Sequence, residues 1–482
     1  MTIPLLSDDP HDRALLQNVK PSSWVNPTPL PRYQLVVIGG GTAGLICAAG
    51  AAGLGAKVAL VERDLLGGDC LNVGCVPSKA MIRASKASTE IRRAQQFGVN
   101  TEQMSVDFAA VMERVRRVRA GLSAHDSAER FRSLGVDVFL GEGRFLNEDT
   151  VEVNGSKLKF GRCVIATGTR PSVPEIPGLK ESQWFTNESI FTLTDLPKRL
   201  LVLGAGPVGC ELAQAFARLG SKVTLFTRSG RVLPKEDRDA ALIVEKAMRE
   251  DSVDFTTEPI NPSSFDTVLV ATGRQPNVER LNLNSAGVAY DPKLGVQVDD
   301  YLRTTNHRIF AAGDVTSLGY KFTHAADAMA RLVIRNALFP TKGRASQLVI
   351  PWCTYTEPEI GTVGLNEEEA IKRNIPATIF RQAASQLDRA STDGAESWVK
   401  VLVQEGTDRI LGATVVGPHA GELIGTISLA MTNEIGLKKL ANTVFPYPTF
   451  TEAIKKTGDQ YNRSRLTPKA KWLIEKWLHW FR

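Results

Sequence analysis

A strand, glycine turn, helix and strand near the N-terminus constrain the fold of this chain more than any other feature. Residues 33–62 start with a β-branched run, pass through G-x-G-x-x-G and an alanine-rich stretch, and finish a second apolar run at Glu62. Gly39 permits the tight turn, Gly41 lets the backbone approach a pyrophosphate, and Gly44 lets helix and strand pack closely. The N–H groups at the helix start attract phosphate, and Glu62 can accept hydrogen bonds from ribose hydroxyls. The series predicts a dinucleotide site, with a ligand-free tight turn as the alternative.

The same stretch has a competing interpretation as a membrane helix. Residues 33–56 carry no charge and are long enough to span a bilayer. However, seven of these 24 residues are glycine, and a glycine-rich turn follows the β-branched run. We therefore expect a buried strand, turn and helix here.

A second copy of the pattern follows about 165 residues later, with Gly204, Gly206 and Gly209 in its turn. Its second strand leads to Arg228, where an NAD site would carry a carboxylate. Arg228, with Arg231 nearby, offers cations that could pair with the 2′-phosphate of NADP. NADPH is the predicted electron donor and NADH the alternative, while two solvent-facing arginines remain the simpler interpretation.

Three shorter pieces support a flavin architecture. VIATGTRP (164–171) and VLVATGRQPN (268–277) are strand-to-glycine turns of one type, and RIFAAGDVT (308–316) ends a strand on a Gly-Asp pair. Each piece alone is typical of an ordinary strand end, but the three in this order are hard to obtain by chance. The further residues that we expect at the nucleotides are Gly143, Thr167, Gly168, Gly313 and Asp314 for the flavin and Gly273 for NADPH.

A pair of cysteines follows the first nucleotide unit in the segment GGDCLNVGCVPSKAMI. Cys70 and Cys75 lie where we expect a helix to begin near Pro77, and a helix start lowers the pKa of a nearby thiol. Zinc is a poor alternative because no second Cys/His pair is spaced to complete a tetrahedral site; two buried structural cysteines are the other alternative. Lys79, one turn after Cys75, would bring a cation toward the ligand, and Glu211 is its expected partner.

Composition limits the remaining classes of function. The length of 482 residues predicts about three domains, and a net charge of +6 gives no support for nucleic-acid binding. Six cysteines are too few for a disulfide-stapled secreted protein and suit the cytoplasm. The first 32 residues hold six prolines and three acids, so we expect an irregular arm and no signal or transit peptide. The cysteines in apolar contexts, which we expect to be inert, are Cys47, Cys163, Cys210 and Cys353.

Taken together, the order G-x-G-x-x-G, C-x-x-x-x-C, G-x-G-x-x-G, A-T-G-R and A-A-G-D resembles the pyridine nucleotide–disulfide oxidoreductases. This group includes glutathione reductase, dihydrolipoamide dehydrogenase and mercuric reductase, and ELAQAFARLGSKVTL looks especially like the last. The resemblance covers about residues 33–465. It implies an α/β fold with two Rossmann-like dinucleotide-binding domains, for FAD and NAD(P), and a C-terminal α+β dimerisation domain that makes a homodimer.

The resemblance also implies roles for individual residues. Glu62 and Asp314 would bind FAD, and Lys79, paired with Glu211, would sit near the flavin. Cys75 would form the thiolate that contacts the isoalloxazine, and Cys70 would be the outer interchange thiol. The expected domains are an N-terminal arm (1–32), the FAD domain in two parts (33–175 and 276–348), a shortened NAD(P) domain (176–275), the dimerisation domain (349–465) and a tail (466–482).

The sequence departs from the family at the H-P-x-x-x-E motif of its disulfide reductases. Here Tyr447 takes the place of the histidine, with Glu452 at the end of the motif. The pKa of tyrosine is about 10 against about 6.5 for histidine, so Tyr447 is a poorer proton shuttle near neutrality. Mercuric reductases also carry tyrosine here, and soft Hg(II) prefers thiolates. With no cysteine before Cys47 or after Cys353, we expect neither an N-terminal metal-binding domain nor a C-terminal cysteine pair.

The predicted function is therefore the transfer of electrons from NADPH through FAD and the Cys70–Cys75 dithiol to a soft metal ion, which we predict to be Hg(II). A disulfide or quinone reductase is the alternative among enzymes, and a flavin-binding redox sensor or scaffold is the alternative from another class. The stretch from Arg231 to Ala271 is only about 40 residues long, whereas the family usually has a three-stranded meander there. We expect one or two strands to be missing.

The tail is the last departure. Residues 463–482 hold six basic residues and one acidic residue, a net charge of +5 out of +6 for the chain. On a helical wheel one face gathers Leu473, Ile474, Trp477, Leu478, Trp480 and Phe481, opposite Lys471, Glu475, Lys476 and Arg482. This pattern suits a membrane interface, which would give peripheral contact through 467–482 at the inner face of the membrane, and packing on the dimer surface is the alternative.

Overall fold

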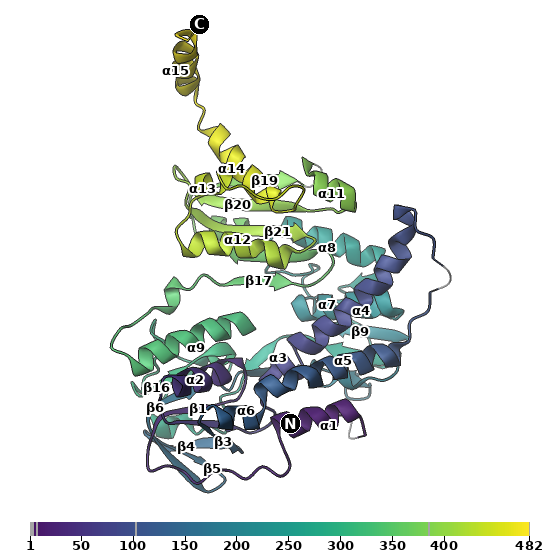
Figure 1. Ribbon diagram of the computed structural model, residues 1–482. Coiled ribbons are helices and arrows are strands. Elements are labelled where there is room, and N and C mark those ends of the chain that lie inside the picture. The colour runs from purple at the N-terminus through teal and green to yellow at the C-terminus, as the bar shows by residue number, and fades with distance from the viewer. Residues whose placement is uncertain (1–3, 6–7, 102–103, 384–385, 482) are drawn as a thin grey trace. The chain divides into compact units, whose positions relative to one another are not determined.

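The computed structural model describes residues 4–5, 8–101, 104–383 and 386–481 and divides into two compact units (Figure 1). The first unit covers the described residues of Met1–Gly230 and Ser252–Leu348, and the second those of Arg231–Asp251 and Val349–Arg482. The fold is α/β, as expected from the alternation of apolar strands with glycine turns and helices. Arg482, expected on the polar face of the tail, lies outside the described residues.

A seven-stranded sheet forms the centre of the first unit. Its order is β3-β2-β1-β6-β5-β4, and β16 pairs with β6 on the side away from β1. The strands around β1 are parallel, and Val36 lies between Ala59 of β2 and Cys163 of β6. These positions are completely buried, which explains the uninterrupted apolar runs in the sequence. The strands are β1 (Tyr33–Ile38), β2 (Val58–Glu62), β3 (Val136–Leu140), β4 (Gly143–Asn147), β5 (Thr150–Val153), β6 (Ser156–Ile165) and β16 (Ile309–Ala311).

Helices in this unit carry the two cysteines and begin directly after the nucleotide turns. α2 packs against α9, while α4 packs against both α5 and α7. The helices are α1 (Pro10–Val19), α2 (Thr42–Gly53), α3 (Gly68–Asn72), α4 (Cys75–Arg93), α5 (Phe108–Ser123), α6 (Ala128–Ser133), α7 (Pro207–Leu219) and α9 (Thr323–Leu338). Short 3-10 helices occupy Ala94–Phe97, Ala124–Asp126, Ile190–Thr192, Pro262–Ser264, Leu283–Ala286, Gly313–Val315 and Ala345–Gln347.

A second, parallel sheet in the first unit contains the second nucleotide turn. Its order is β11-β10-β9-β12-β8. The strands are β8 (Trp184–Phe185), β9 (Arg199–Leu203), β10 (Lys222–Phe226), β11 (Val253–Thr256) and β12 (Thr267–Val270). All residues between β11 and β12 are described, and their regular structure is a single 3-10 turn at Pro262–Ser264. The chain therefore passes from β11 to β12 without a meander.

Two small antiparallel pairs complete the strands of the first unit. β7 pairs with β13, and β14 pairs with β15. Their bounds are β7 (Thr169–Pro171), β13 (Arg274–Pro276), β14 (Tyr290–Asp291) and β15 (Gly295–Val296). The first of these pairs brings the two strand-to-glycine turns of the sequence together.

The second unit is an antiparallel sheet with helices, α+β as expected. Its order is β17-β18-β21-β20-β19. The strands are β17 (Pro351–Thr354), β18 (Glu359–Gly364), β19 (Ala377–Ala383), β20 (Trp398–Gln404) and β21 (Ile410–Gly417). The helices are α8 (Arg238–Glu250), α10 (Glu367–Lys372), α11 (Asp388–Asp393), α12 (Ala420–Thr432), α13 (Leu437–Ala441), α14 (Glu452–Ser464) and α15 (Pro468–His479).

Residues 231–251 belong to this second unit because buried charges attach them to its sheet. Lys400 Nζ, on β20, lies 3.0 Å from a carboxylate oxygen of Asp237 and 2.9 Å from Glu367 Oε2. Glu236 accepts hydrogen bonds from Trp352 Nε1 at 2.8 Å and from Thr362 Oγ1 at 2.9 Å. Such a cluster stays stable only with all its partners present.

The N-terminal arm contains a helix, contrary to the expectation from its prolines, whereas residues 20–32 form no helix or strand, as expected. Asp9 caps α1 by accepting the N–H of His11 at 2.8 Å, and Pro10 occupies the first helical position, where a missing N–H costs nothing. The helix lies on the body, because Asp12 pairs with Arg119 of α5 and both side chains are about 2% exposed. Arg119 Nη1 also donates to the carbonyl of Asn72 at 3.0 Å, between the two cysteines.

Within the described residues, the structure contains no helix that is both long enough and apolar enough to cross a membrane. The apolar stretch at 33–56 forms β1, its turn and α2, as expected.

Candidate redox site

The first glycine turn is built so that side chains are excluded from it. Gly39 has φ +107°, and a Cβ there would lie 2.3 Å from the carbonyl oxygen of Ala166. A Cβ on Gly44 would lie 1.7 Å from the carbonyl oxygen of Gly39. Gly41 precedes α2 and provides no side chain to cap it, so the first N–H groups of the helix are available to an anion. This cradle fits the pyrophosphate of a dinucleotide.

Glu62 ends β2 directly beside this turn. Its carboxylate accepts the N–H of Gly40 at 2.5 Å and that of Asp64 at 2.6 Å. Burial raises the pKa of Glu62, and these two hydrogen bonds oppose the rise. Each carboxylate oxygen keeps a further lone pair, so the position fits the predicted contact with ribose.

The second glycine turn repeats the same construction. Gly204 has φ +112°, and a Cβ there would lie 2.5 Å from the carbonyl oxygen of Ala271. A Cβ on Gly209 would lie 1.9 Å from the carbonyl oxygen of Gly204, and Gly206 precedes α7 without a side-chain cap. The structure therefore contains two dinucleotide cradles of one design.

The two arginines predicted beside the second cradle have different environments. Arg228 is exposed, just beyond the carboxyl end of β10 in the sheet that carries the cradle. Arg231 lies in the second unit, where its Nη2 is 3.2 Å from Glu368 Oε1. A contact of Arg231 with the 2′-phosphate remains a prediction, and Arg228 is the better placed candidate.

We expect Arg228→Ala to raise the KM for NADPH by about 10- to 100-fold, because a hydrogen bond to a charged group contributes about 1.5–3 kcal/mol. The KM for NADH, which lacks the phosphate, should stay within about twofold. Steady-state kinetics with both donors measure this. Arg199→Ala is the matched control, since Arg199 is exposed at the opposite end of β9 and pairs with Asp266. Equal effects on both donors would contradict the assignment.

The two strand-to-glycine turns bind each other. Thr167 Oγ1 donates to the carbonyl of Asn277 at 2.8 Å, and Asn277 Nδ2 donates back to the carbonyl of Thr167 at 2.9 Å. Gly168 and Gly273 adopt positive φ, +64° and +136°, with open space at the Cβ position. Glycine is therefore favoured at both positions by the backbone conformation, since a side chain would meet no neighbouring atom there.

A polar network that was not predicted from the sequence connects this junction to the cysteine segment. Arg274 Nε donates to Thr169 Oγ1 at 2.7 Å, and Thr169 Oγ1 donates to Asp314 Oδ2 at 3.1 Å. Arg274 also forms an ion pair with Asp69, next to Cys70. Burial raises the pKa of Asp314, opposed by Arg274 and Thr169. In the sequence, Arg274 could have been identified as a site residue from its place at the end of the A-T-G-R motif.

Two predicted flavin contacts have simpler structural explanations as well. Gly143 begins β4, where a Cβ would lie 3.0 Å from Val61 Cγ1. Gly313 has φ +79° and would place a Cβ 3.3 Å from that of Ala43, at the start of α2. The second glycine therefore lies at the cradle, and a flavin contact for each stays a prediction.

The two cysteines present unequal thiols. Cys75 begins α4, two residues before the expected start at Pro77, and is exposed, whereas Cys70 is half-buried in α3. Hydrogen bonding with Cys70 lowers the pKa of Cys75 by more than the loss of surrounding water raises it, and Thr323 and Lys79 lower it further. The Cys75 Sγ lies 3.3 Å from Thr323 Oγ1. The same hydrogen bond raises the pKa of Cys70 far above its ordinary value. These opposite directions favour Cys75 over Cys70 as the thiolate, which remains a prediction.

Lys79 and Glu211 form the expected ion pair. Lys79 Nζ lies 2.7 Å from Glu211 Oε2, and the glutamate is 5% exposed. The pair joins α4 to α7, and the cation lies one helical turn from Cys75. The structure therefore brings together the cysteines, Lys79 and Glu211, and their catalytic roles remain predictions.

We expect the alkylation rate of Cys75 by iodoacetamide to rise with pH through a midpoint below that of an ordinary thiol, because its pKa is lowered. Cys70→Ala removes the largest cause and should move the midpoint upward. Cys70→Ser is the matched control, since serine keeps a hydroxyl donor, and its midpoint should move less. Mass spectrometry of the modified peptide follows the reaction. An unchanged midpoint in Cys70→Ala would exclude the proposed origin of the low pKa.

The residues of the altered family motif lie in the second unit. The Tyr447 hydroxyl donates to Asp388 Oδ2 at 2.5 Å, and this hydrogen bond raises the pKa of Tyr447. Glu452 begins α14, and its Oε2 is buried without a hydrogen-bond partner among the described residues. Tyr447 therefore holds its proton firmly.

Three of the four other cysteines are buried. Cys47, Cys163 and Cys210 are inaccessible to solvent, and burial raises the pKa of Cys47 to about 12. Cys353 is half-buried. A thiol that stays protonated is a poor nucleophile, so the raised pKa of Cys47 agrees with the expectation that it is inert, while the inertness of Cys353 stays a prediction.

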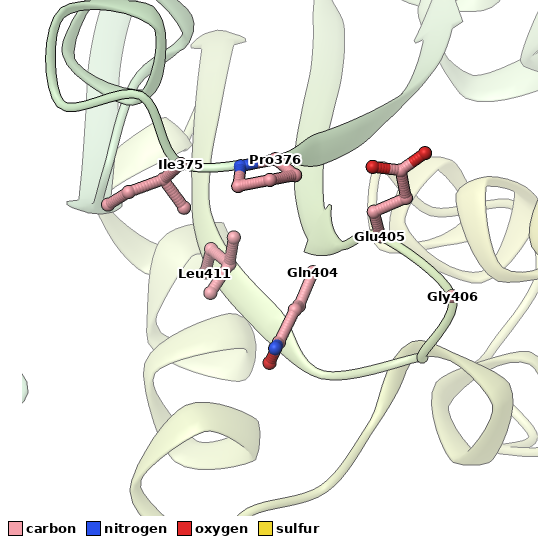
Figure 2. A pocket seen from close by; sticks show the side chains of 6 residues that line it. All are labelled: Ile375, Pro376, Gln404, Glu405, Gly406 and Leu411. Atoms are coloured by element: carbon pink, nitrogen blue, oxygen red, sulfur yellow. The ribbon is translucent and has the colours of Figure 1, made fainter.

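A hollow in the second unit is not a candidate for redox chemistry (Figure 2). It encloses about 460 Å³ between Ile375, Pro376, Leu411 and the β-turn residues Gln404, Glu405 and Gly406. Its lining contains no thiol and no cation, and it includes none of the predicted site residues.

Comparison with known proteins gives consistent matches over most of the chain. A family model described as pyridine nucleotide-disulphide oxidoreductase matches residues 33–260 and 262–330, and one for the dimerisation domain of these proteins matches 350–457. A mercuric reductase of Bacillus cereus is 35% identical over 445 residues, covering 88% of this chain and 70% of that protein. A dihydrolipoyl dehydrogenase of Chlamydia trachomatis is 32% identical over 447 residues, covering 87% and 95% respectively.

A solved structure extends this likeness to three dimensions. The HOCl-induced flavoprotein disulfide reductase RclA from Escherichia coli aligns with a TM-score of 0.78 and 27% identity, over 89% of this chain and 99% of that chain. RclA is also known as a Cu(II) complex, which aligns equally well.

Proposed function

The chain belongs to the pyridine nucleotide-disulphide oxidoreductase family, and we propose that it uses the electrons of NADPH to reduce Hg(II) at the Cys70–Cys75 pair. Family members use FAD and NAD(P)H, and the dimerisation-domain match indicates a homodimer. The proposed reaction consumes NADPH and Hg²⁺ and yields NADP⁺, Hg⁰ and one proton. The free thiols suit the reducing cytoplasm that we propose as its location.

The cradles supply the sites for both nucleotides in this proposal. Gly39, Gly41 and Gly44 would hold the FAD pyrophosphate, Glu62 would accept hydrogen bonds from the ribose, and Asp314 is the second proposed carboxylate contact of FAD. The second cradle holds NADPH through Gly204, Gly206, Gly209 and Arg228. When bound, the flavin supplies the transfer of two electrons from the nicotinamide to the sulfur pair.

The protein's own groups prepare the two sulfurs for a soft cation. The Cys75 thiolate binds first, because it is exposed and its pKa is lowered. Cys70 then releases its proton to water and supplies the second sulfur, and soft Hg(II) favours two thiolate ligands. Lys79, held by Glu211, stabilises the charge on Cys75.

Tyr447 is the observation that favours a metal ion over a disulfide. Reduction of a disulfide releases a thiol that needs a proton, and the family's reductases supply it from histidine. Tyr447 replaces that histidine, and its hydrogen bond to Asp388 raises its pKa further from neutrality. Reduction of Hg(II) needs no proton donor at this step, so the replacement is compatible with metal reduction. Relatives named mercuric reductase support the same substrate.

A substrate panel tests the proposal. NADPH oxidation by the purified homodimer is measured with Hg(II) in excess thiol, Cu(II), lipoamide, glutathione disulfide and a quinone, and Hg⁰ vapour is collected. Cu(II) is included because RclA was solved with it. We expect Hg(II) to stimulate oxidation at least about tenfold more than either disulfide. Tyr447→His should raise disulfide turnover, while Tyr447→Phe should not.

Each other result selects an alternative. Turnover of lipoamide equal to that of Hg(II) would make the protein a disulfide reductase, and stimulation by the quinone alone would make it a quinone reductase. A protein that NADPH and NADH both fail to reduce would be a flavin-binding sensor or scaffold, and the absent meander would then be the first place to look for the cause.

A further inference from the structure

The C-terminal helix α15 (Pro468–His479) exposes a large apolar surface. The apolar side chains on one side of this helix and in the two residues that follow it are between 43% and 85% exposed; they are Leu473, Ile474, Trp477, Leu478, Trp480 and Phe481. By contrast, Trp398 in the sheet of the same unit is 3% exposed. Contiguous apolar surface of this kind marks a site of interaction.

The helix is stabilised locally and does not need packing to begin. Thr467 Oγ1 accepts the N–H of Ala470 at 3.2 Å, and Pro468 occupies the first position. Trp477 and Phe481 pack edge to face, with ring centroids 4.6 Å apart.

Cations border this apolar face on both sides. At about 100° per residue, Lys469 and Lys476 lie along one edge and Lys471 along the other. Trp472 lies on the polar face, where Lys476 Nζ is 4.1 Å from the centroid of its ring. Residues 463–482 hold six basic residues and one acidic residue, a net charge of +5, and four of the basic residues and the acidic one lie in the tail 466–482.

We propose that α15 docks on the surface of an anionic phospholipid bilayer. The apolar face enters between the headgroups, with Trp477 and Trp480 at the interface, and the lysines at both edges meet lipid phosphates. A second copy of the helix is a poorer occupant, because its lysine-bordered edges would bring like charges together.

Vesicle flotation of the full-length holoenzyme tests this proposal. The protein is mixed with vesicles of phosphatidylcholine alone or of phosphatidylcholine and phosphatidylglycerol at 3:1, in low salt and in high salt. We expect flotation with the anionic vesicles in low salt and release in about 0.5 M salt, where charges are screened within a few ångströms. Absence of flotation with the anionic vesicles would overturn the proposal.

A matched pair of variants separates the apolar face from the polar one. Trp477→Gln with Phe481→Gln should weaken binding by about tenfold or more, whereas Trp472→Gln should change it by less than about threefold. Equal binding by all variants would overturn the proposal. The proposal would also be overturned if the full-length protein bound no vesicles and deletion of 467–482 reduced its particle size. That result would show that the apolar face of α15 binds a second copy of the chain. NADPH oxidation by each variant should match that of the wild type, which shows that the body is folded.

Discussion

Replacing Cys75 with serine is expected to lower NADPH-dependent turnover of the acceptor by at least about a thousandfold, the order of loss seen when a reacting nucleophile is removed. Serine keeps the size of the side chain, but its hydroxyl does not ionise near neutrality and cannot form a disulfide with Cys70. The position is also the one whose pKa the surrounding groups lower. Steady-state oxidation of NADPH, followed at saturating acceptor, measures the loss.

Cys353→Ser is the matched control for this experiment. Cys353 is a half-buried thiol of β17, and it takes no part in the proposed reaction. Its variant should keep turnover within about twofold of the wild type. If Cys75→Ser retained most of its activity, the acceptor would receive its electrons without the dithiol, and the proposed path would be wrong.

The second large effect is expected on stability, from Asp12→Ala. Asp12 and Arg119 are both about 2% exposed. Removing one partner of a buried ion pair leaves an uncompensated charge, which costs about 3–5 kcal/mol. Because Arg119 also donates to the carbonyl of Asn72, the loss should loosen the cysteine segment as well. Urea titration of the holoenzyme, followed by far-UV circular dichroism and by alkylation of Cys75, measures both effects.

Two controls interpret that result. Arg132→Ala removes a partner of Glu129 in a pair that is about two-thirds exposed, and it should cost no more than about 1 kcal/mol. Asp12→Leu with Arg119→Met replaces the buried pair by apolar side chains and should recover much of the loss. A wild-type unfolding midpoint in Asp12→Ala would show that α1 contributes little to the stability of the body.

The sequence was most informative where backbone geometry alone restricts the residue. A Cβ on Gly44 or on Gly209 would lie within 2 Å of a carbonyl oxygen, so the spacing of the glycines in the sequence predicts the turn directly. The Lys79–Glu211 pair was also predictable, because a cation beside a nucleotide helix needs a buried partner and the second nucleotide helix offered one carboxylate in its first turns.

The sequence was least informative about contacts between distant segments. Thr323 lies 248 residues from Cys75 and has no local feature that identifies it as a thiol partner. The helix at the N-terminus was missed because the prolines around it dominate the composition of the arm. Its signals were nevertheless present, since Asp9 and Pro10 begin a helix and Leu15 and Val19 are spaced for one buried face.

The pairing of β7 with β13 has a consequence for how much the segment between them can vary in length. Residues 172–273 form a closed segment, which we call the cassette. Its two ends, Ser172 and Gly273, are held together by the strand pair and by the Thr167–Asn277 hydrogen bonds. Once both ends are fixed, closing a loop twice as long would cost only about 0.6 kcal/mol more. Strands can therefore be deleted inside the cassette, or added to it, without a shift in the register of the sheet outside. The short path from β11 to β12 lies inside this closed segment, and the first nucleotide fold is intact beside it.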